Sequence, residues 1–420
     1  MKNLSKTAKK ILKTNRRKGY TLPTNNKLYP AQWNWDSAFI SIGYSYFNLE
    51  YAIKELETLL KGQWKNGMIP HILFHEKDDS YFPNHKTWKC GNSVSSSGIT
   101  QPPIVATALK LIITRNKLNK NQKKRVILLI KKLKKYHDWF YKYRDPKNTG
   151  LVSIIHPWES GLDNSPLWDS SLEKIKIDKK LSYKRRDLEV SNSKARPLNR
   201  DYDCYITLLN QFKSENYNPN KILDISMFNI IDIGFNSIFL KANKDLLELL
   251  KLYELDYSGF EEKIDKTENS ILDLYNEKEN MFFSFDLKNN VQIKIPSLTN
   301  FLILFADLKH DNVNAKIIKN LEEFNINEKY FFTTMNPNHN SFEEKRYWRG
   351  PVWINTNWII YRSLINKNKN FAEKIKKNTI QLINHNNFHE YYSSKTGLPF
   401  GANNFSWSAA LYLDLVLGDI

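Results

Sequence analysis

The segment HPWESGLDNSPLWD, at residues 156–169, holds the densest group of side chains that could do chemistry. It carries Glu159 and Asp163 between Trp158 and Trp168, and it follows the turn sequence DPKNTG. A carboxyl group among apolar rings or beside another anion has a raised pKa, which suits a general acid for glycoside cleavage. Asp163 is therefore the candidate acid. The structural alternative is the acid of an Asx turn that faces solvent.

An inverting glycoside hydrolase needs a second carboxylate across the sugar ring, roughly 6.5–9.5 Å from the first, with room for the attacking water. Glu390 is the best candidate, in the segment FHEYYSSKTGLPFGANNFSWSAA. We expect it in an aromatic loop before the last helix, where Gly397 and Gly401 permit close approach of the backbone to a ligand. An exposed glutamate at a helix C-terminus is the alternative interpretation.

Three further segments resemble the walls of a sugar-binding cleft, because flat rings cover the apolar faces of a pyranose. The predicted wall residues are Tyr29, Trp33, Trp35 and Asp36 in YPAQWNWDSAF, Gln101 in GITQPPIVATAL, and Arg349 and Gly350 in YWRGPVWINTNW. Gln101 precedes a Pro-Pro helix start, so we expect its amide at a helix N-terminus. Capped helix starts that pack aromatic rings into the core would give the same patterns.

No metal or organic cofactor is expected from the sequence. His71 and His75 have the spacing of a zinc pair, but Pro70 precedes them and no glutamate follows His71 as in HExxH. The two cysteines, Cys90 and Cys204, form no CxxC pair, and no GxGxxG, P-loop or GxSxG motif occurs.

Helical periodicity recurs along the chain, and βαβ alternation does not. Helices are predicted near 1–25, 51–64, 102–117, 122–144, 202–214, 226–253, 257–275, 298–308, 312–323, 352–366, 369–386 and 405–418. The long connections 65–100, 150–200, 324–351 and 387–404 are expected to carry function. FFSFDL, KNN and VQIKI predict one short β-hairpin, with an extended piece near 330–335. The pattern indicates one all-α domain over 1–420 whose loops build an active face.

The net charge of +19 raises nucleic acid as a partner, but lysine and asparagine are abundant everywhere, which is typical of a compositional bias over solvated faces. We expect neither a nucleic-acid nor a membrane partner. The basic N-terminal segment 1–25 is predicted to pack as a short helix on the body. It has no apolar run of signal-peptide length, and no stretch approaches 18 apolar residues, so a cytoplasmic location is expected.

Taken together, the motifs resemble glycoside hydrolase family 63, nearest its mannosylglycerate and glucosylglycerate hydrolase branch. The matching segments are YPAQWNWDSAF, ELETLLKGQWKNGMIPHILF, YFPNHKTW, SSGITQPPIVATAL, HPWESGLDNSPLWD, RPLNRDYDCY, RYWRGPVWINTNW and EYYSSKTGLPFGANNFSWSAALYLD. They follow the family's order from residue 29 to 414. The resemblance implies an (α/α)6 toroid of six helical hairpins. It also implies an inverting mechanism in which the Asp of ESGxD, Asp163, is the acid and the Glu of ExYxPxTG, Glu390, is the base.

The resemblance also implies a sugar subsite and a substrate class. The implied lining residues are Tyr29, Trp35, Asp36, Gln101, Trp158, Arg349 and Trp407. Trp33, Glu159, Gly161 and Gly350 are predicted as further substrate-binding residues beside them. The expected substrate is a small α-mannoside or α-glucoside. Mannosylglycerate and glucosylglycerate are the leading candidates, and the enzyme would cleave either to free sugar and glycerate. The carboxylate of such a substrate requires a cation, for which Arg196 and Arg200 in SKARPLNRDYDCY are the candidates. The sequence departs from the family pattern at Ser394, in place of proline, and at Cys204, in place of a basic residue.

Two other functions stay open at this stage. A trehalase or an oligosaccharide α-glucosidase would use the same toroid and the same pair of carboxylates. A sugar epimerase on this toroid would rely on histidines, and His156 and His389 lie beside the two candidate carboxylates in the sequence. The oligomeric state is not predicted.

Overall fold

The computed structural model of the protein describes residues 2–26, 28–190, 193–324 and 327–418. Met1 and residues 419–420, which belong to the predicted N-terminal segment and to the predicted domain 1–420, lie outside this range. The longer helices are α1 (Lys2–Asn15), α2 (Asn34–Ser45), α3 (Leu49–Lys61), α5 (Val105–Arg115), α6 (Lys120–Tyr143), α9 (Asn199–Ser214), α11 (Ile233–Leu252), α12 (Phe260–Ile271), α13 (Asp311–Phe324), α14 (Ile354–Leu364), α15 (Lys369–Asn386) and α16 (Ser406–Leu417).

Short helices and 3-10 segments fill the connections between the longer helices. The short α-helices are α4 (His85–Trp88), α7 (Asp169–Leu172), α8 (Asp187–Val190) and α10 (Pro219–Ile225). The 3-10 segments are η1 (Pro157–Ser160), η2 (Pro166–Trp168), η3 (Ser193–Ala195), η4 (Leu272–Leu274), η5 (Leu298–Ala306) and η6 (Tyr347–Arg349). The fold is therefore rich in helix with few strands, as predicted.

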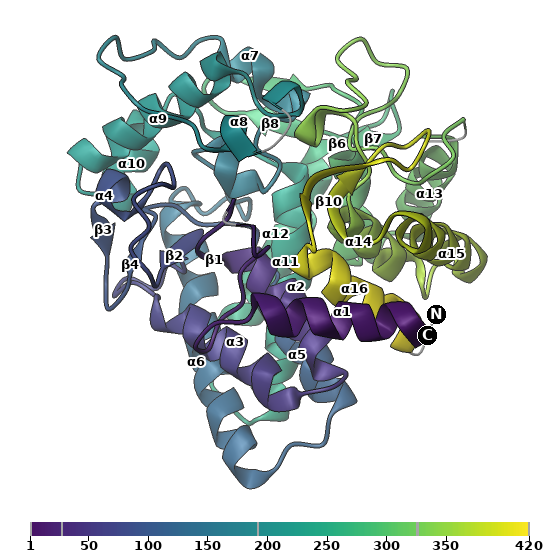
Figure 1. The fold of residues 1–420 in the computed structure, drawn as a ribbon. Coiled ribbons are helices and arrows are strands. Elements are labelled where there is room, and N and C mark those ends of the chain that lie inside the picture. Colours follow the sequence, from purple (N-terminus) through teal and green to yellow (C-terminus); the bar gives the residue numbers. More distant parts are fainter. Residues whose placement is uncertain (1, 27, 191–192, 325–326, 419–420) are drawn as a thin grey trace.

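Two kinds of helix form two layers. Helix α2 is buried along all of its length, and α16 is buried from Ser406 to Leu415. These two helices pack on each other. Together with α5, α11, η5 and α14 they form a continuous series of buried elements in which each packs on the next. The outer helices α1, α3, α6, α12, α13 and α15 are apolar on one side only, the side that packs on this inner layer. Figure 1 shows the N-terminal helix α1 lying alongside the C-terminal helix α16.

The strands are short and belong to four small sheets. They are β1 (Gln32–Trp33), β2 (Ile72–Phe74), β3 (Cys90–Gly91), β4 (Ser95–Ser96), β5 (Ile230–Ile231), β6 (Tyr275–Asn276), β7 (Met281–Phe282), β8 (Ser284–Asp286), β9 (Val291–Ile293), β10 (His389–Tyr392) and β11 (Pro399–Asn403). The predicted hairpin is confirmed as β8 and β9, with Phe285 opposite Gln292. The expectation of one hairpin is wrong, since the described residues include the orders β1-β2-β4-β3, β5-β8-β9, β6-β7 and β10-β11.

Three predicted elements differ from the structure. Helix α2 was not predicted, because a helix buried on every side shows no apolar stripe. The helix predicted at 226–253 begins only at Ile233, where Asp232 caps it by accepting hydrogen bonds from Gly234 and Phe235. The helix predicted at 298–308 is the 3-10 segment η5.

Candidate active site

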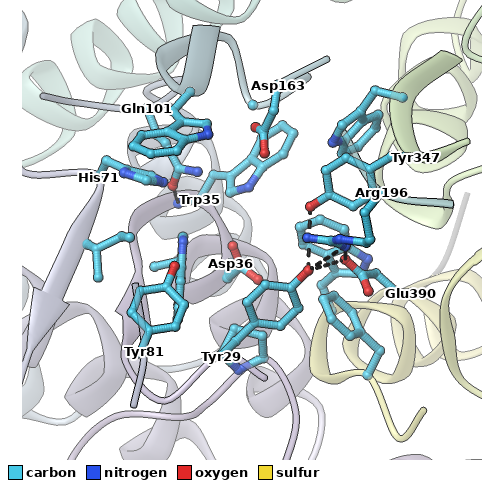
Figure 2. A pocket seen from close by; sticks show the side chains of 18 of the residues that line it. Tyr29, Trp35, Asp36, His71, Tyr81, Gln101, Asp163, Arg196, Tyr347 and Glu390 are labelled. Carbon is cyan, nitrogen blue, oxygen red and sulfur yellow. Dashed lines mark hydrogen bonds and ion pairs between the residues drawn. The ribbon is translucent and has the colours of Figure 1, made fainter. Parts of the chain in front are cut away.

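A pocket of about 640 Å3, measured to its open mouth, lies where the long connections meet. Its walls carry the candidate acid Asp163, the candidate base Glu390 and Arg196. Figure 2 shows these three side chains converging on one space from separate parts of the chain. Predicted wall residues that do line the pocket are Tyr29, Trp33, Trp35, Asp36, Gln101, Trp158, Gly161 and Trp407. The aromatic rings and carboxylates together suit a polyhydroxylated ligand with two apolar faces.

The loop that carries Asp163 is fixed at both ends. His156 caps η1 by accepting a hydrogen bond from Trp158 N through Nδ1, at 3.1 Å. After η1 the chain turns at Gly161 with φ +76°, and a Cβ there would lie 2.6 Å from the Trp35 ring. Tyr205 donates a hydrogen bond to the main-chain carbonyl of Asp163 at 2.8 Å. The Asp163 side chain is thus presented to the pocket by a tightly held turn.

Glu159 does not line the pocket; it is buried in the protein and anchors the loop that carries Asp163. Its carboxylate is buried, and it accepts hydrogen bonds from Arg144 at 2.5 Å, from Thr100 N at 3.2 Å and from Ile155 N at 2.8 Å. The sequence placed Glu159 in the substrate site and beside Asp163. The structure gives it a scaffold position instead, with its charge compensated by Arg144.

Burial raises the pKa of Asp163 to about 7. Arg196 acts in the opposite direction, while the negative charges of Glu390 and Asp187 raise the pKa further. A carboxyl group with this pKa holds its proton in a substantial fraction of molecules at neutral pH, as a general acid must. The sequence predicted that an apolar or anionic neighbourhood would raise this pKa, and both burial and neighbouring negative charges contribute.

Glu390 lies on strand β10, not in the loop that the sequence predicted. Its Oε2 accepts a hydrogen bond from Ala402 N at 2.9 Å, and its Oε1 accepts one from the Tyr29 hydroxyl at 2.6 Å. The neighbouring strand β11 passes over this carboxylate at Gly401, with φ +67°, where a Cβ would overlap Oε2. Glycine is required there both by the backbone conformation and by the close approach.

The environment of Glu390 differs from that of Asp163. Burial raises the pKa of Glu390 above its usual range, although Arg196 and the Tyr29 hydrogen bond act in the opposite direction and limit the rise. The Arg196 Nη1 atom lies 3.7 Å from Oε1 of Glu390 and donates a hydrogen bond to the Tyr29 hydroxyl at 3.1 Å. Figure 2 shows this triangle of Arg196, Tyr29 and Glu390. These partners favour an ionised Glu390, which is the form that a base requires.

Gln101 and Asp36 complete the polar lining at the start of α2. The Gln101 Oε1 atom accepts a hydrogen bond from Trp35 N at 3.3 Å. Gln101 was expected at the start of the helix that follows it, but it caps α2, which precedes it in the chain. Burial raises the pKa of Asp36 well above its usual range, and the charges of Glu390, Glu55 and Asp163 act in the same direction.

Two other predicted wall residues lie outside the pocket lining. Arg349 binds the carboxylate of Asp169 through Nη1 and Nη2, at 2.8 and 2.7 Å, and its Nε lies 2.9 Å from Glu343. Gly350 lies against the backbone of Glu343. These contacts make Arg349 and Gly350 part of the scaffold that holds η6, whose Tyr347 and Trp348 do line the pocket.

The pocket also contains residues that the sequence did not single out as ligands. They are Pro23, His71, Ile72, Tyr81, Pro83, Tyr202, Tyr347, Trp348 and Phe405. Tyr81 and Tyr202 lie in the quoted family segments YFPNHKTW and RPLNRDYDCY, which is the one sequence feature that could have indicated them. Cys204, at the departure from the family pattern, is buried with Sγ directed to the Leu172 carbonyl and does not line the pocket.

Among the residues that the structure describes, no cluster of three or more His, Cys, Asp or Glu could hold a metal ion. The same part of the chain contains no helix that is both long and apolar enough to span a membrane.

Comparison with known proteins agrees with this geometry. Residues 29–408 match the family model of the mannosylglycerate hydrolase MGH1-like glycoside hydrolase domain. The chain is 39% identical to a mannosylglycerate hydrolase of Thermus thermophilus, over 97% of this chain and 99% of that protein. It is 30% identical to the glucosylglycerate hydrolase of Mycolicibacterium hassiacum, over 92% of each protein.

Solved structures show the same relationship. A family 63 mannosylglycerate hydrolase from Thermus thermophilus, in complex with Tris and D-glycerate, superposes with a TM-score of 0.94 at 38% identity, over 98% of this chain and 99% of that one. Neutral trehalase Nth1 of Saccharomyces cerevisiae shares the fold, with a TM-score of 0.58 at 14% identity over 95% of this chain and 73% of that one.

The family model and the relatives that span the chain show that it is a glycoside hydrolase. More particularly, the chain belongs to the MGH1-like branch of glycoside hydrolase family 63, whose model covers most of its length.

Proposed function

We propose that the protein hydrolyses mannosylglycerate to free mannose and glycerate with inversion at the anomeric carbon. The observation that carries this proposal is the pocket itself, in which Asp163 and Glu390 face one space beside the buried guanidinium of Arg196. Relatives that span nearly the whole chain are named mannosylglycerate hydrolases. One solved relative holds D-glycerate together with Tris.

The proposed reaction is a single displacement. Glu390 takes a proton from a water molecule, whose oxygen attacks C1 of the sugar on the face opposite the leaving group. At the same time the C1–O bond breaks, and Asp163 gives its proton to the departing glycerate oxygen. The raised pKa of Asp163 and the two hydrogen bonds to Glu390 support this division of roles.

Arg196 is the proposed partner of the glycerate carboxylate. It lines the pocket and is buried, whereas Arg200, the other candidate cation, is exposed and does not line it. Arg196 also lies beside both catalytic candidates. The Tyr81 and Tyr202 hydroxyl groups on the same lining offer further donors to a carboxylate or a hydroxyl group. Trp35, Trp158 and Trp407 offer ring faces to the sugar, and Asp36 and Gln101 offer polar atoms to its hydroxyl groups.

An (α/α)6 toroid is the proposed architecture, with 1–420 as a single domain. The packing of α2, α5, α11, η5, α14 and α16, in which the last element contacts the first, supports an inner ring. The outer layer of α1, α3, α6, α12, α13 and α15 supports the pairing into six hairpins. A cytoplasmic location and a small anionic α-glycoside as the substrate belong to the same proposal.

A substrate panel tests the proposed function. Mannosylglycerate, glucosylglycerate, trehalose and maltose are each incubated with the protein, and NMR identifies the first anomer released. We expect mannosylglycerate to have the highest kcat/KM and the first mannose to be the β-anomer. The 30% identical glucosylglycerate hydrolase makes glucosylglycerate the second candidate substrate. A preference for trehalose or maltose, or an isomerised rather than hydrolysed product, would overturn the proposal in favour of the alternative functions.

A further inference from the structure

Asp187 makes a double ion pair just outside the pocket lining. It is the first residue of the short helix α8, and its side chain is buried. Its Oδ2 accepts hydrogen bonds from Arg196 Nε at 3.2 Å and from Arg185 Nη2 at 2.7 Å, and its Oδ1 accepts one from Arg185 Nε at 3.1 Å. The carboxylate of Asp187 therefore lies between two arginines, only one of which lines the pocket.

The guanidinium of Arg196 is held on three sides. Its Nε edge faces Asp187, and its Nη1 faces the Tyr29 hydroxyl and Glu390. Its flat face lies 4.2 Å from the centre of the Tyr347 ring. A planar guanidinium with one edge and one face already bound has a single remaining orientation, because its donors are fixed in a fork.

Arg185 completes the arrangement from the outer side. Its Nη1 donates a hydrogen bond to the Pro197 carbonyl at 2.8 Å, next to Arg196 in the chain, and its guanidinium lies 3.8 Å from the centre of the Tyr202 ring. Removal of Asp187 would leave two buried like charges facing each other, which is costly in a water-poor site.

We propose that Asp187 is a positioning residue of the glycosidase reaction, which holds Arg196 by its Nε edge and directs Nη1 toward Tyr29 and Glu390. This inference rests on the proposed roles of Asp163 and Glu390. Asp187 does not line the pocket, so it acts by holding Arg196 and through the field of its charge.

The charge of Asp187 also sets how much positive charge the two catalytic carboxyl groups experience. Burial acts to raise the pKa of Asp187, but Arg196 and Arg185 lower it below its usual range, so the group is ionised. Arg196 lowers the pKa values of Asp163 and Glu390. Asp187 offsets part of that effect at Asp163. The other titratable groups around Arg196 and Asp187 are Tyr29, Tyr81, Tyr183, Tyr202, Tyr347 and Tyr391.

The experiment compares kcat/KM across pH for the wild type, Asp187→Asn and Glu189→Gln. Glu189 is the matched control, because it lies two residues further on in α8, is exposed and pairs only with the exposed Lys184 among the ion pairs of the described residues. In Asp187→Asn we expect both limbs of the profile to move to lower pH by ~0.5 unit. We also expect KM for mannosylglycerate to rise about tenfold, because Arg196 is no longer held for its carboxylate. Glu189→Gln should match the wild type.

A second variant, Arg185→Gln, is expected to shift the pH profile of kcat/KM in the opposite direction. Arg185→Gln keeps the Asp187 carboxylate but removes its competing partner, so more of the Asp187 charge falls on Arg196, and both limbs should move to higher pH. Limbs that stay within ~0.2 unit of the wild type in either folded variant would overturn the proposal, since a purely structural residue changes the amount of active enzyme and not its pH profile. Failure of the proposed function itself is recognised separately, by wild-type turnover in Asp163→Asn.

Discussion

The hydroxyl group of Tyr29 donates a 2.6 Å hydrogen bond to Oε1 of Glu390, a residue 361 positions further along the chain. The same hydroxyl group accepts a hydrogen bond from Arg196. Tyr29 thus lies between the positively charged Arg196 and the carboxylate that is proposed to activate water, and it hydrogen-bonds to both. The base is held by a residue from the opposite end of the sequence.

Replacement of Tyr29 by phenylalanine tests this relationship. Loss of the hydrogen bond should raise the pKa of Glu390, because that bond stabilises the ionised carboxylate. We expect the acid limb of kcat/KM to move to higher pH and the maximum to fall about tenfold. Tyr20→Phe is the control, because the Tyr20 hydroxyl binds Glu76 away from the pocket. An unchanged acid limb in Tyr29→Phe would contradict the assignment.

The activity of the wild type should decline as the pH rises through about 7. The proposed acid must carry a proton, and burial raises the pKa of Asp163 to about 7. Glu390 must instead be ionised, so activity should also decline on the acid side. Initial rates on mannosylglycerate from pH 4 to pH 10 would give this bell-shaped profile. A flat rate between pH 7 and pH 9 would show that the proton does not come from a group such as Asp163.

Asp163→Asn should abolish turnover and increase stability at alkaline pH. The folded-state pKa of Asp163 lies above the unfolded value, so its contribution to stability is full below about pH 4 and is lost as the pH rises to about 7. Asparagine carries no charge, and the gain in unfolding free energy should reach about 1–2 kcal/mol at pH 8 and be smaller at pH 4. Thermal unfolding of both proteins at the two pH values measures it. An equal difference in stability between the two proteins at both pH values would show that the raised pKa of Asp163 is not its cause.

Gly401→Ala should impair catalysis beyond its effect on backbone strain. The Cβ would overlap the Glu390 carboxylate and displace the proposed base. Gly259 has the same φ of +67°, but a Cβ there would meet nothing closer than 4.0 Å. Both variants should lose about 1 kcal/mol of stability because both place alanine at positive φ, and Gly401→Ala should lose more because of the overlap. Only Gly401→Ala should lose most of its kcat; equal activities would show that Glu390 tolerates the contact.

Glu159→Gln should destabilise the protein by about 3–5 kcal/mol, because it leaves the buried Arg144 guanidinium without a counter-charge. Glu57→Gln is the matched control, since Glu57 pairs with Arg125 at a more exposed position and should cost at most about 1 kcal/mol. Chemical denaturation of the two variants measures both values. Similar losses in the two would mean that Glu159 is not an anchor of the Asp163 loop.

The sequence allowed prediction of the elements that face solvent on one side. Helix α15 begins and ends where its apolar spacing predicted, at Lys369 and Asn386. Helix α2 was missed because it has no polar side. Periodicity thus predicted the outer helices and most of the inner elements, and it failed at α2, where burial on every side removes the pattern that identifies a helix.

Residues of the pocket were predictable where a sequence motif identifies them, and they were not predictable where their position depends on tertiary contacts. Asp163, Glu390 and the rings around them followed from residue type and setting. The scaffold positions of Glu159 and Arg349 did not, because their partners Arg144 and Asp169 could be identified only from the folded chain. The strand of Glu390 was missed for a similar reason: β10 is four residues long, and its pairing with β11 defines it.

The two ends of the chain meet beside the pocket. The Asn15 side chain donates a hydrogen bond to the Ser406 hydroxyl, and Ser406 N donates one to the Pro23 carbonyl. These contacts join the segment before Tyr29 to the helix after Glu390, so they help to hold the proposed base beside its hydrogen-bond partner. Contacts this distant in sequence form slowly, because closing so long a loop costs conformational entropy before the contact is made. The proposed active site is therefore complete only when these two distant segments of the chain are in contact.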